Sequence, residues 1–254
     1  VSRIVPTNMP ASMVGCPKAC AMSDAMRLAL VGATGLVGRH VVEACVGRRD
    51  LRLAAVARRE MALPKGATME MFVAEPSHWG DVFEALRPRA LICALGTTWK
   101  QAGEDEAAFR AVDYDLVLET ARAAKAQGCD RMVVVSSVGA DPHAKQFYLR
   151  VKGEVERELG RVGFHRLDIL RPGLLRGDRG GDRRPAERLA IAASPLFNLL
   201  LHGKYAQYRA IEAETVAQAC LALALKPARG RFAHSNSGIE RAARSLPLPT
   251  AELD

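Results

Sequence analysis

Aromatic side chains are scarce in this chain of 254 residues, since Phe, Trp and Tyr together make up only 5% of it. A core must therefore be built mostly from Ala, Val and Leu, and with 49% hydrophobic residues the chain has enough of them. No uninterrupted apolar run reaches 18 residues, so the sequence predicts no membrane-spanning helix. The length and composition indicate one large globular domain, alone or with a small appended lobe.

Metal-binding patterns are missing as well. Among the six cysteines only Cys16 and Cys20 lie close together, without a second Cys or His pair at zinc-ligand spacing. His143 and His202 are isolated, and we expect no metal site. Most of the cysteines lie within apolar stretches, which is typical of buried, reduced thiols. On this basis we predict a cytoplasmic protein.

The net charge of the chain is +8, but the sequence contains no basic run with interleaved aromatic residues. Its arginines are scattered along the chain, and we therefore expect no nucleic-acid partner. The surplus of positive charge fits a phosphate-rich cofactor, or contact with an acidic membrane surface as the less favoured alternative.

Short apolar runs alternate with segments of helical periodicity from residue 27 onward. Six strands are expected, over residues 27–31, 51–57, 68–74, 90–95, 131–137 and 166–173. The intervening helices are expected over residues 36–47, 77–86, 104–127 and 144–162. Strands that alternate with helices of this length predict an α/β fold, a doubly wound parallel sheet of the Rossmann type.

The two ends of the chain lie outside this pattern. We expect residues 1–25 to be a disordered leader, residues 26–242 a single domain, and residues 243–254 a loose tail. A polar, glycine-rich loop over residues 176–185 precedes two helical segments, 185–201 and 213–225, without another strong strand. This region, from about residue 174, predicts a small helical substrate lobe over the carboxyl edge of the sheet. The apolar stretch at 194–205 suits a lid, a membrane-surface contact or an ordinary packed helix.

A glycine-rich turn, "GATGLVG", joins the first strand to its helix and places Gly32, Gly35 and Gly38 at three-residue intervals. Such a turn lets the backbone approach a pyrophosphate closely, and the helix amino terminus then offers its unpaired N–H groups. We therefore predict a dinucleotide site, the alternative being a turn whose glycines serve packing alone.

An arginine pair, Arg58 and Arg59, ends the second strand, where folds that bind NAD commonly place an acidic residue for the ribose hydroxyls. Guanidinium groups suit a 2′-phosphate instead. We therefore predict NADP(H) as the preferred cofactor, with NAD(H) as the alternative. The plain interpretation of the pair is two solvated arginines at a strand end.

A Tyr-x-x-x-Lys pair, Tyr148 and Lys152, lies on the helix after the fifth strand, and that strand ends in Ser136 and Ser137. Positions i and i+4 share one helix face, so both side chains can point toward the cofactor crevice. A nearby ammonium favours the phenolate form of a tyrosine and so suits it to acid–base work. The plain alternative is two residues on the surface of an amphipathic helix. Asp113 and Asp115 likewise allow two interpretations, as active-site support or as solvated carboxylates.

Together these motifs resemble the short-chain dehydrogenase/reductase superfamily in its atypical branch, and within it the Tat-interacting-protein-like oxidoreductases. The matching pieces are "GATGLVG", "VARR", "CALGTTWKQAG", "FRAVDYD", "VVVSSVGAD", "FYLRVKGEVE" and "ILRPGLLRGDR", which span residues 27–182. The resemblance implies a catalytic trio of Ser137, Tyr148 and Lys152, in which the serine hydroxyl positions the oxygen of the substrate. The cofactor-binding set that it implies is Gly32, Thr34, Gly35, Leu36, Val37, Gly38, Arg58, Arg59, Leu95, Gly96, Thr97, Ser136, Tyr148, Lys152, Pro172 and Gly173.

Two functions follow as hypotheses. The first is an NADP(H)-dependent oxidoreductase that moves a hydride between nicotinamide and a small carbonyl or alcohol substrate. The second is a protein that binds NADPH as a sensor, or as a regulatory or assembly factor, without turnover. A monomer or a homodimer is expected in either case.

Overall fold

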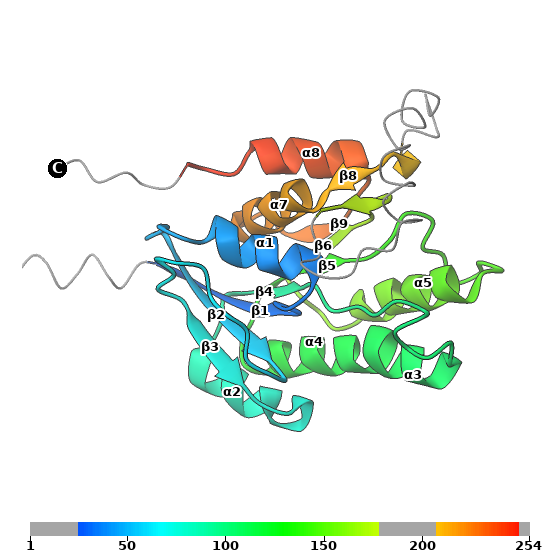
Figure 1. Cartoon of the computed structure of the whole chain (residues 1–254), viewed down its shortest axis with the longest axis horizontal. Helices are drawn as coiled ribbons and strands as arrows, with labels where there is room; N and C mark the ends of the chain where they lie inside the picture. Colours follow the sequence, from blue (N-terminus) through cyan, green and yellow to red (C-terminus); the bar gives the residue numbers. More distant parts are fainter. Residues whose placement is uncertain (1–24, 178–206, 249–254) are drawn as a thin grey trace, which may run out of the picture.

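The computed structural model describes residues 25–177 and 207–248 of the chain. Its centre is a parallel seven-stranded sheet in the order β3-β2-β1-β4-β5-β6-β9 (Figure 1). The strands are β1 (Met26–Val31), β2 (Leu51–Ala57), β3 (Glu70–Val73), β4 (Ala90–Cys93), β5 (Arg131–Val135), β6 (Arg166–Leu170) and β9 (Gly230–His234). A separate pair of two-residue strands consists of β7 (Leu175–Arg176) and β8 (Ile211–Glu212). The predicted Rossmann-type α/β fold is confirmed.

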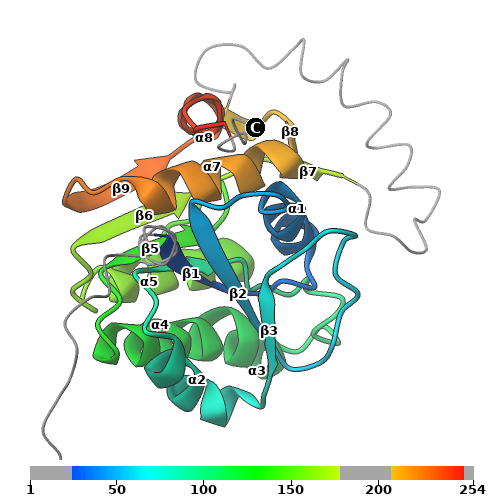
Figure 2. The ribbon, with the colours of Figure 1, turned by 90° about the vertical axis from the view of Figure 1, so that its left-hand side faces the viewer.

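Helices cover both faces of the sheet (Figures 1 and 2). One layer contains α1 (Leu36–Ala44), α7 (Ala213–Leu225) and α8 (Asn236–Arg244). The other contains α2 (Trp79–Leu86), α3 (Glu106–Arg110), α4 (Val117–Ala126) and α5 (Phe147–Leu159). A short 3-10 turn, Pro76–His78, precedes α2. Among the described helices none is both long and apolar enough to cross a membrane.

The central strands are apolar along most of their length because both of their faces are buried. In β1, Leu28 and Leu30 belong to the core under α1 and α7, whereas Ala29 and Val31 belong to the core under α2 and α4. This arrangement explains why the apolar runs in the sequence are continuous rather than alternating. It also fixes the strand ends from which the loops of the site emerge.

All six predicted strands are present, but the prediction of no strong strand after the glycine-rich loop is wrong. Strand β9 pairs with β6 in parallel register, Arg166 opposite Gly230 through Leu170 opposite His234. It lies at the edge of the sheet and is partly exposed, so its five residues carry little apolar signal. Helix α7, which was predicted over the same residues, packs against α1, α8, β4 and β5 and so covers one face of the sheet.

One long helix was predicted over residues 104–127, and the structure divides it. Between α3 and α4, residues Ala111–Leu116 form a π-helical segment that shifts the phase of the helix. Segments of this kind occur frequently at functional sites. The shift places Asp113 inside the protein, with none of its surface exposed.

Several predictions fall on parts of the chain outside the described residues. They are the leader, except for its last residue, the helix over residues 185–201, His202, Cys16, Cys20 and the last six residues of the tail. The substrate lobe stays a prediction for the same reason, since most of the stretch between Arg176 and Tyr208 is among them.

Candidate active site

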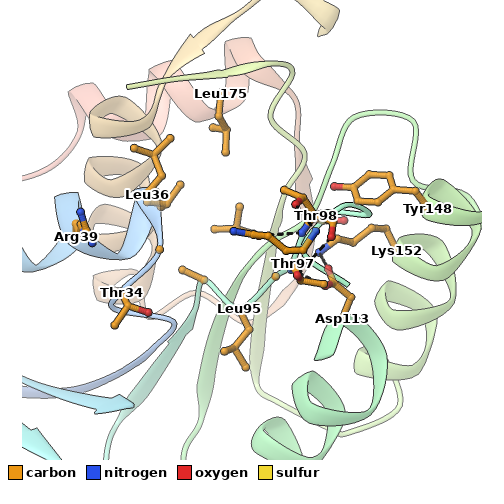
Figure 3. A pocket seen from close by; sticks show the side chains of 17 residues that line it. Thr34, Leu36, Arg39, Leu95, Thr97, Thr98, Asp113, Tyr148, Lys152 and Leu175 are labelled. Carbon is orange, nitrogen blue, oxygen red and sulfur yellow. Dashed lines mark hydrogen bonds and ion pairs between the residues drawn. The ribbon is translucent and has the colours of Figure 1, made fainter. Parts of the chain in front are cut away.

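A cavity of about 340 Å³ opens at the carboxyl ends of β1, β4 and β5 (Figure 3). Strand order reverses here, because the chain runs from β1 to β2 on one side and returns to β4 on the other. Ligands of open α/β sheets bind at such a switch point. The lining residues are Thr34, Gly35, Leu36, Val37, Arg39, Ala94, Leu95, Gly96, Thr97, Thr98, Gln101, Asp113, Val135, Ser136, Tyr148, Lys152 and Leu175.

The glycine turn forms one wall of this cavity. Gly32 has φ +84°, and a Cβ on it would lie 2.4 Å from the carbonyl oxygen of Ala94. A Cβ on Gly38 would lie 2.1 Å from the carbonyl oxygen of Gly32. Packing therefore explains Gly32 and Gly38, neither of which lines the cavity, whereas Gly35 does line it. Packing thus accounts for two of the three glycines, and a role in dinucleotide binding stays a prediction for Gly35.

Helix α1 presents its amino terminus to the cavity. Gly35 is its N-cap residue and supplies no side-chain hydrogen bond, so the first N–H groups of the helix are not capped by a side chain. The positive end of the helix dipole lies at the same place. Arg39, an exposed cation, lines the cavity one turn further along α1. Uncapped N–H groups and a glycine without a side chain suit the diphosphate of a dinucleotide, and the guanidinium suits a further phosphate.

The opposite wall carries a buried ion pair. The ammonium of Lys152, on α5, lies 2.7 Å from Oδ1 of Asp113, and their side chains are 8% and 0% exposed. The backbone N–H of Thr97 donates a hydrogen bond of 2.7 Å to Oδ2 of the same carboxylate. Asp113 therefore joins the loop after β4 to the lysine on α5, as Figure 3 shows.

Burial of Lys152 opposes its positive charge, but the adjacent Asp113 carboxylate and Tyr148 favour that charge more strongly. The net result is that the pKa of Lys152 is raised above its ordinary value. The lysine is therefore a cation at every physiological pH. A fixed positive charge at this place can stabilise a phenolate or donate to a ligand hydroxyl.

Tyr148 lies one turn before Lys152 on α5, and its phenol oxygen points into the cavity (Figure 3). Its ring packs edge-on against the fully buried ring of Phe109, with centroids 5.6 Å apart. The side chain remains 36% exposed. The predicted pair of Tyr148 and Lys152 thus shares one helix face and one cavity.

The hydroxyls of the two serines after β5 form hydrogen bonds with groups other than this pair. Ser136 lines the cavity, yet its hydroxyl donates to Oε1 of the buried Glu156 at 2.5 Å. Arg171 holds that carboxylate in place through its own hydrogen bonds. Ser137 does not line the cavity, and its hydroxyl donates to the carbonyl oxygen of Val138 at 3.3 Å. Among the described residues, neither serine hydroxyl is directed to the phenol of Tyr148 by a hydrogen bond.

Some of the other predicted residues line the cavity, and others lie outside its lining. Leu95, Gly96 and Thr97 line the cavity, as do Thr34, Leu36 and Val37. The pair of Arg58 and Arg59 is exposed after β2 and outside the lining. Pro172 and Gly173 also lie outside it; the Pro172 carbonyl accepts from Val138 N, and the Gly173 N–H donates to Asn236 Oδ1.

Seven further residues line the cavity that the site prediction did not include or did not favour. Four of them are polar or charged, namely Arg39, Thr98, Gln101 and Asp113, and three are apolar, namely Ala94, Val135 and Leu175. Arg39 could have been recognised in the sequence from its position directly after the third glycine of the turn. Thr98 and Gln101 belong to the "GTTWKQAG" segment, which marked the family resemblance without an assigned role. Within residues 25–177 and 207–248, no cluster of His, Cys, Asp or Glu could hold a metal ion.

Comparison with known proteins identifies a family and several similar relatives. The model of a family described as NAD(P)H-binding matches residues 32–227. The mitochondrial protein fmp52 of Aspergillus niger is 34% identical over 210 residues, which cover 80% of this chain and 88% of that protein. Mitochondrial fmp52 of Emericella nidulans is 36% identical over 170 residues, or 64% and 72% of the two chains. Mitochondrial FMP52 of Saccharomyces cerevisiae is 36% identical over 161 residues, or 61% and 68%.

Solved structures share the fold. UDP-glucose 4-epimerase of Thermus thermophilus, in complex with NAD, has 22% identity and a TM-score of 0.63 over 86% of this chain and 82% of its own. MoeE5, in complex with UDP-glucose and NAD, has 18% identity and a TM-score of 0.62 over 82% and 74%. At these identities the likeness concerns the fold alone.

The relatives also correct one prediction. Curated proteins 34–37% identical to this chain are named as mitochondrial, which contradicts the predicted cytoplasmic location. That prediction rested on buried thiols. The burial of a thiol depends only on local packing, whereas the location of a protein in the cell is determined by its targeting segments.

Proposed function

Because this chain belongs to the NAD(P)H-binding family and is a relative of the fmp52 proteins, we propose that it is an NADP(H)-dependent oxidoreductase of the short-chain dehydrogenase/reductase type. Its substrate would be a small carbonyl or alcohol compound. The observation that carries this proposal is the shared cavity. The phenol of Tyr148 opens into the same space as the uncapped amino terminus of α1, with the Lys152 ammonium beside it.

The residues of the cavity divide into two groups. Thr34, Gly35, Leu36 and Val37 would hold the diphosphate of the dinucleotide at the amino terminus of α1. The loop of Leu95, Gly96 and Thr97 would pass along the rest of the cofactor. The nicotinamide ring, when bound, supplies or accepts the hydride.

The chain's own residues would handle the proton. In a reduction, the hydroxyl of Tyr148 gives its proton to the carbonyl oxygen, and the resulting phenolate is stabilised by the positive charge of Lys152. The phenolate then regains a proton from solvent. In an oxidation, the phenolate takes the proton of the substrate's hydroxyl. Asp113 keeps Lys152 in its place through the ion pair of 2.7 Å.

The preference for NADP(H) rests on guanidinium groups. Arg39 lines the cavity, and Arg58 and Arg59 follow the strand next to β1. A 2′-phosphate suits such groups. We expect Arg39→Ala to weaken NADPH binding more than NADH binding, measured by titration calorimetry. Arg58→Ala with Arg59→Ala should act in the same direction. Unchanged ratios of the two dissociation constants in both variants would remove the preference.

A second function, an NAD(P)H-binding protein without turnover, is favoured by one observation. Both serine hydroxyls are engaged by other groups, Ser136 by Glu156 and Ser137 by the Val138 carbonyl. A site that only reports cofactor occupancy has no need of an aligned serine. This alternative predicts tight cofactor binding and no reduction of any carbonyl substrate.

Turnover distinguishes the two functions. Aldehydes, ketones and quinones are screened for NADPH oxidation by the wild type, by Tyr148→Phe and by the control Tyr114→Phe, whose ring stacks with Arg110 outside the cavity lining. The oxidoreductase predicts activity that is lost in Tyr148→Phe, by about a hundredfold or more, and kept in the control. Equal rates in all three proteins would remove Tyr148 as the proton donor.

We also propose the finer placement of the chain among the Tat-interacting-protein-like oxidoreductases and a mitochondrial location. The first is supported by the matched "GTTWKQAG" and "RPGLLRGDR" segments. The second is supported by the names of the relatives. Fractionation of cells that express the full protein tests the location, and recovery outside the mitochondrial fraction would contradict it.

A further inference from the structure

The substrate end of the cavity lacks the hydrogen-bond donor that the sequence suggested for it. A carbonyl oxygen that takes a proton from Tyr148 is best held by a second donor, which orients it. The hydroxyls of Ser136 and Ser137 both donate elsewhere. The Lys152 ammonium is held by Asp113. Another residue of the lining is therefore the better candidate for this donor.

Three other polar side chains line the cavity on the loop after β4: Thr97, Thr98 and Gln101. Thr98 and Gln101 close a reciprocal turn. The backbone N–H of Thr98 donates to Oε1 of Gln101 at 3.2 Å, and the backbone N–H of Gln101 donates to Oγ1 of Thr98 at 3.2 Å. The Gln101 side chain is thus fixed at its oxygen end.

This turn decides the orientation of the Gln101 amide. A backbone N–H can only donate, so the group that faces Thr98 must be the amide oxygen. The amide nitrogen, with its two N–H donors, therefore faces away from the turn. Because Gln101 is one of the lining residues, these N–H donors are available to the cavity without any change of protonation.

Aromatic packing fixes the same loop beside the proton donor. The Trp99 ring lies 5.6 Å from the Phe147 ring and 6.3 Å from the Phe109 ring, measured between centroids. Phe109 in turn contacts the Tyr148 ring at 5.6 Å. Since Phe147 and Tyr148 are neighbours at the start of α5, Trp99 holds the turn of Gln101 on the helix that carries the phenol.

We propose that the side-chain amide of Gln101 is the second hydrogen-bond donor to the oxygen of the substrate, in the role that a serine was expected to fill. Gln101 then selects substrates with an acceptor oxygen at the reacting carbon and shares that oxygen with Tyr148. The inference rests on the proposed oxidoreductase function. It assigns no role to Gln101 in holding the dinucleotide.

Two substitutions separate the amide's donor from its acceptor. Gln101→Glu keeps an acceptor of the same length for the Thr98 N–H but loses both donors at neutral pH. Gln101→Leu loses both functions. Gln218→Leu, at a half-buried position of α7 whose amide donates to Glu214, is the matched control outside the cavity lining. Circular dichroism establishes that each variant is folded, and kcat/KM for the carbonyl and the Kd for NADPH are measured for each.

We expect kcat/KM for the carbonyl to fall about tenfold in Gln101→Glu and in Gln101→Leu, the loss of one hydrogen bond to the reacting oxygen. The Kd for NADPH should stay within about twofold of the wild type, as should every value of Gln218→Leu. Unchanged kcat/KM in both Gln101 variants, with Tyr148→Phe inactive, would overturn the inference and leave the proposed function intact. A weaker NADPH affinity that accounts for the whole loss would also overturn it, because Gln101 would then serve the cofactor. No turnover by the wild type would overturn both.

Discussion

The ion pair between Asp113 and Lys152 offers the sharpest test of how this site is built. Asp113→Asn preserves the shape of the side chain and an acceptor for the Thr97 N–H, which now bonds at 2.7 Å. It removes the negative charge that lies 2.7 Å from the Lys152 ammonium. In addition, the amide N–H group of the new side chain would face the ammonium, so two donors would meet.

The expected cost is large because both side chains are inside the protein, at 0% and 8% exposure. Removal of one partner from a buried pair typically costs about 3–5 kcal/mol, since the remaining charge stays desolvated. We therefore expect the free energy of unfolding to fall by about 3 kcal/mol at pH 7. Asp115→Asn, at an exposed carboxylate two residues further on, should change it by less than about 0.5 kcal/mol.

The pH dependence gives a second signature. In the wild type the pKa of Lys152 is raised, so the pair's contribution is fully present below the ordinary lysine value of about 10.5 and is lost as the pH rises through the raised value. In Asp113→Asn the carboxylate that favours the Lys152 charge is gone, while burial still opposes that charge. The folded state therefore releases the lysine proton more readily. The difference in stability between the two proteins should therefore shrink as the pH rises from 7 toward 10.5.

Urea unfolding followed by circular dichroism measures both quantities. A double-mutant cycle with Lys152→Met isolates the pair, because the double variant leaves no buried charge behind. A stability of Asp113→Asn within about 0.5 kcal/mol of the wild type at all pH values would refute the reasoning. So would a difference that grows with pH.

Two other results are expected. Gly38→Ala should lower the free energy of unfolding by about 1–3 kcal/mol, because the new Cβ would lie 2.1 Å from the Gly32 carbonyl oxygen. Gly80→Ala in α2, where the new Cβ would have no atom within 4 Å, should raise it by up to about 1 kcal/mol. Urea unfolding measures both changes, and equal effects of the two substitutions would contradict the packing argument. Burial raises the pKa of Cys93 to about 11 and of Cys129 to about 12, so these thiols should resist alkylation at pH 8 until the protein unfolds, and stability should fall as the pH rises above 9, where unfolded thiols ionise first. Fast labelling of Cys93 in the native protein, detected by peptide mass spectrometry, would contradict this account.

The parts of the fold that were predictable are those with a strong local signal. β1, β2, β4 and β5 consist mainly of apolar residues that are buried on both faces of the sheet, and the glycine turn is recognised by the spacing of its glycines. Strand β9 has no such signal, because an edge strand is held by the backbone of β6 and leaves part of its surface to solvent. Its pairing depends on residues more than 60 positions away in the sequence.

The same distinction applies to the site. Tyr148 and Lys152 were predictable because helix geometry alone places i and i+4 on one face. The burial of Asp113 was not, since it depends on a π-helical segment and on a partner in a different helix. The direction of the Ser136 hydroxyl depends on Glu156, one helix away, and no spacing rule within the strand end reveals it.

The most direct test of the account is the binding of NADPH to the purified full-length protein, measured by titration calorimetry beside Gly35→Asp. An aspartate at the N-cap of α1 keeps a residue that can cap a helix, but it places a carboxylate where the diphosphate is expected. The account predicts one NADPH per chain for the wild type and a loss of affinity of at least about tenfold in the variant. Equal affinity in both proteins, or no binding by the wild type, would contradict it.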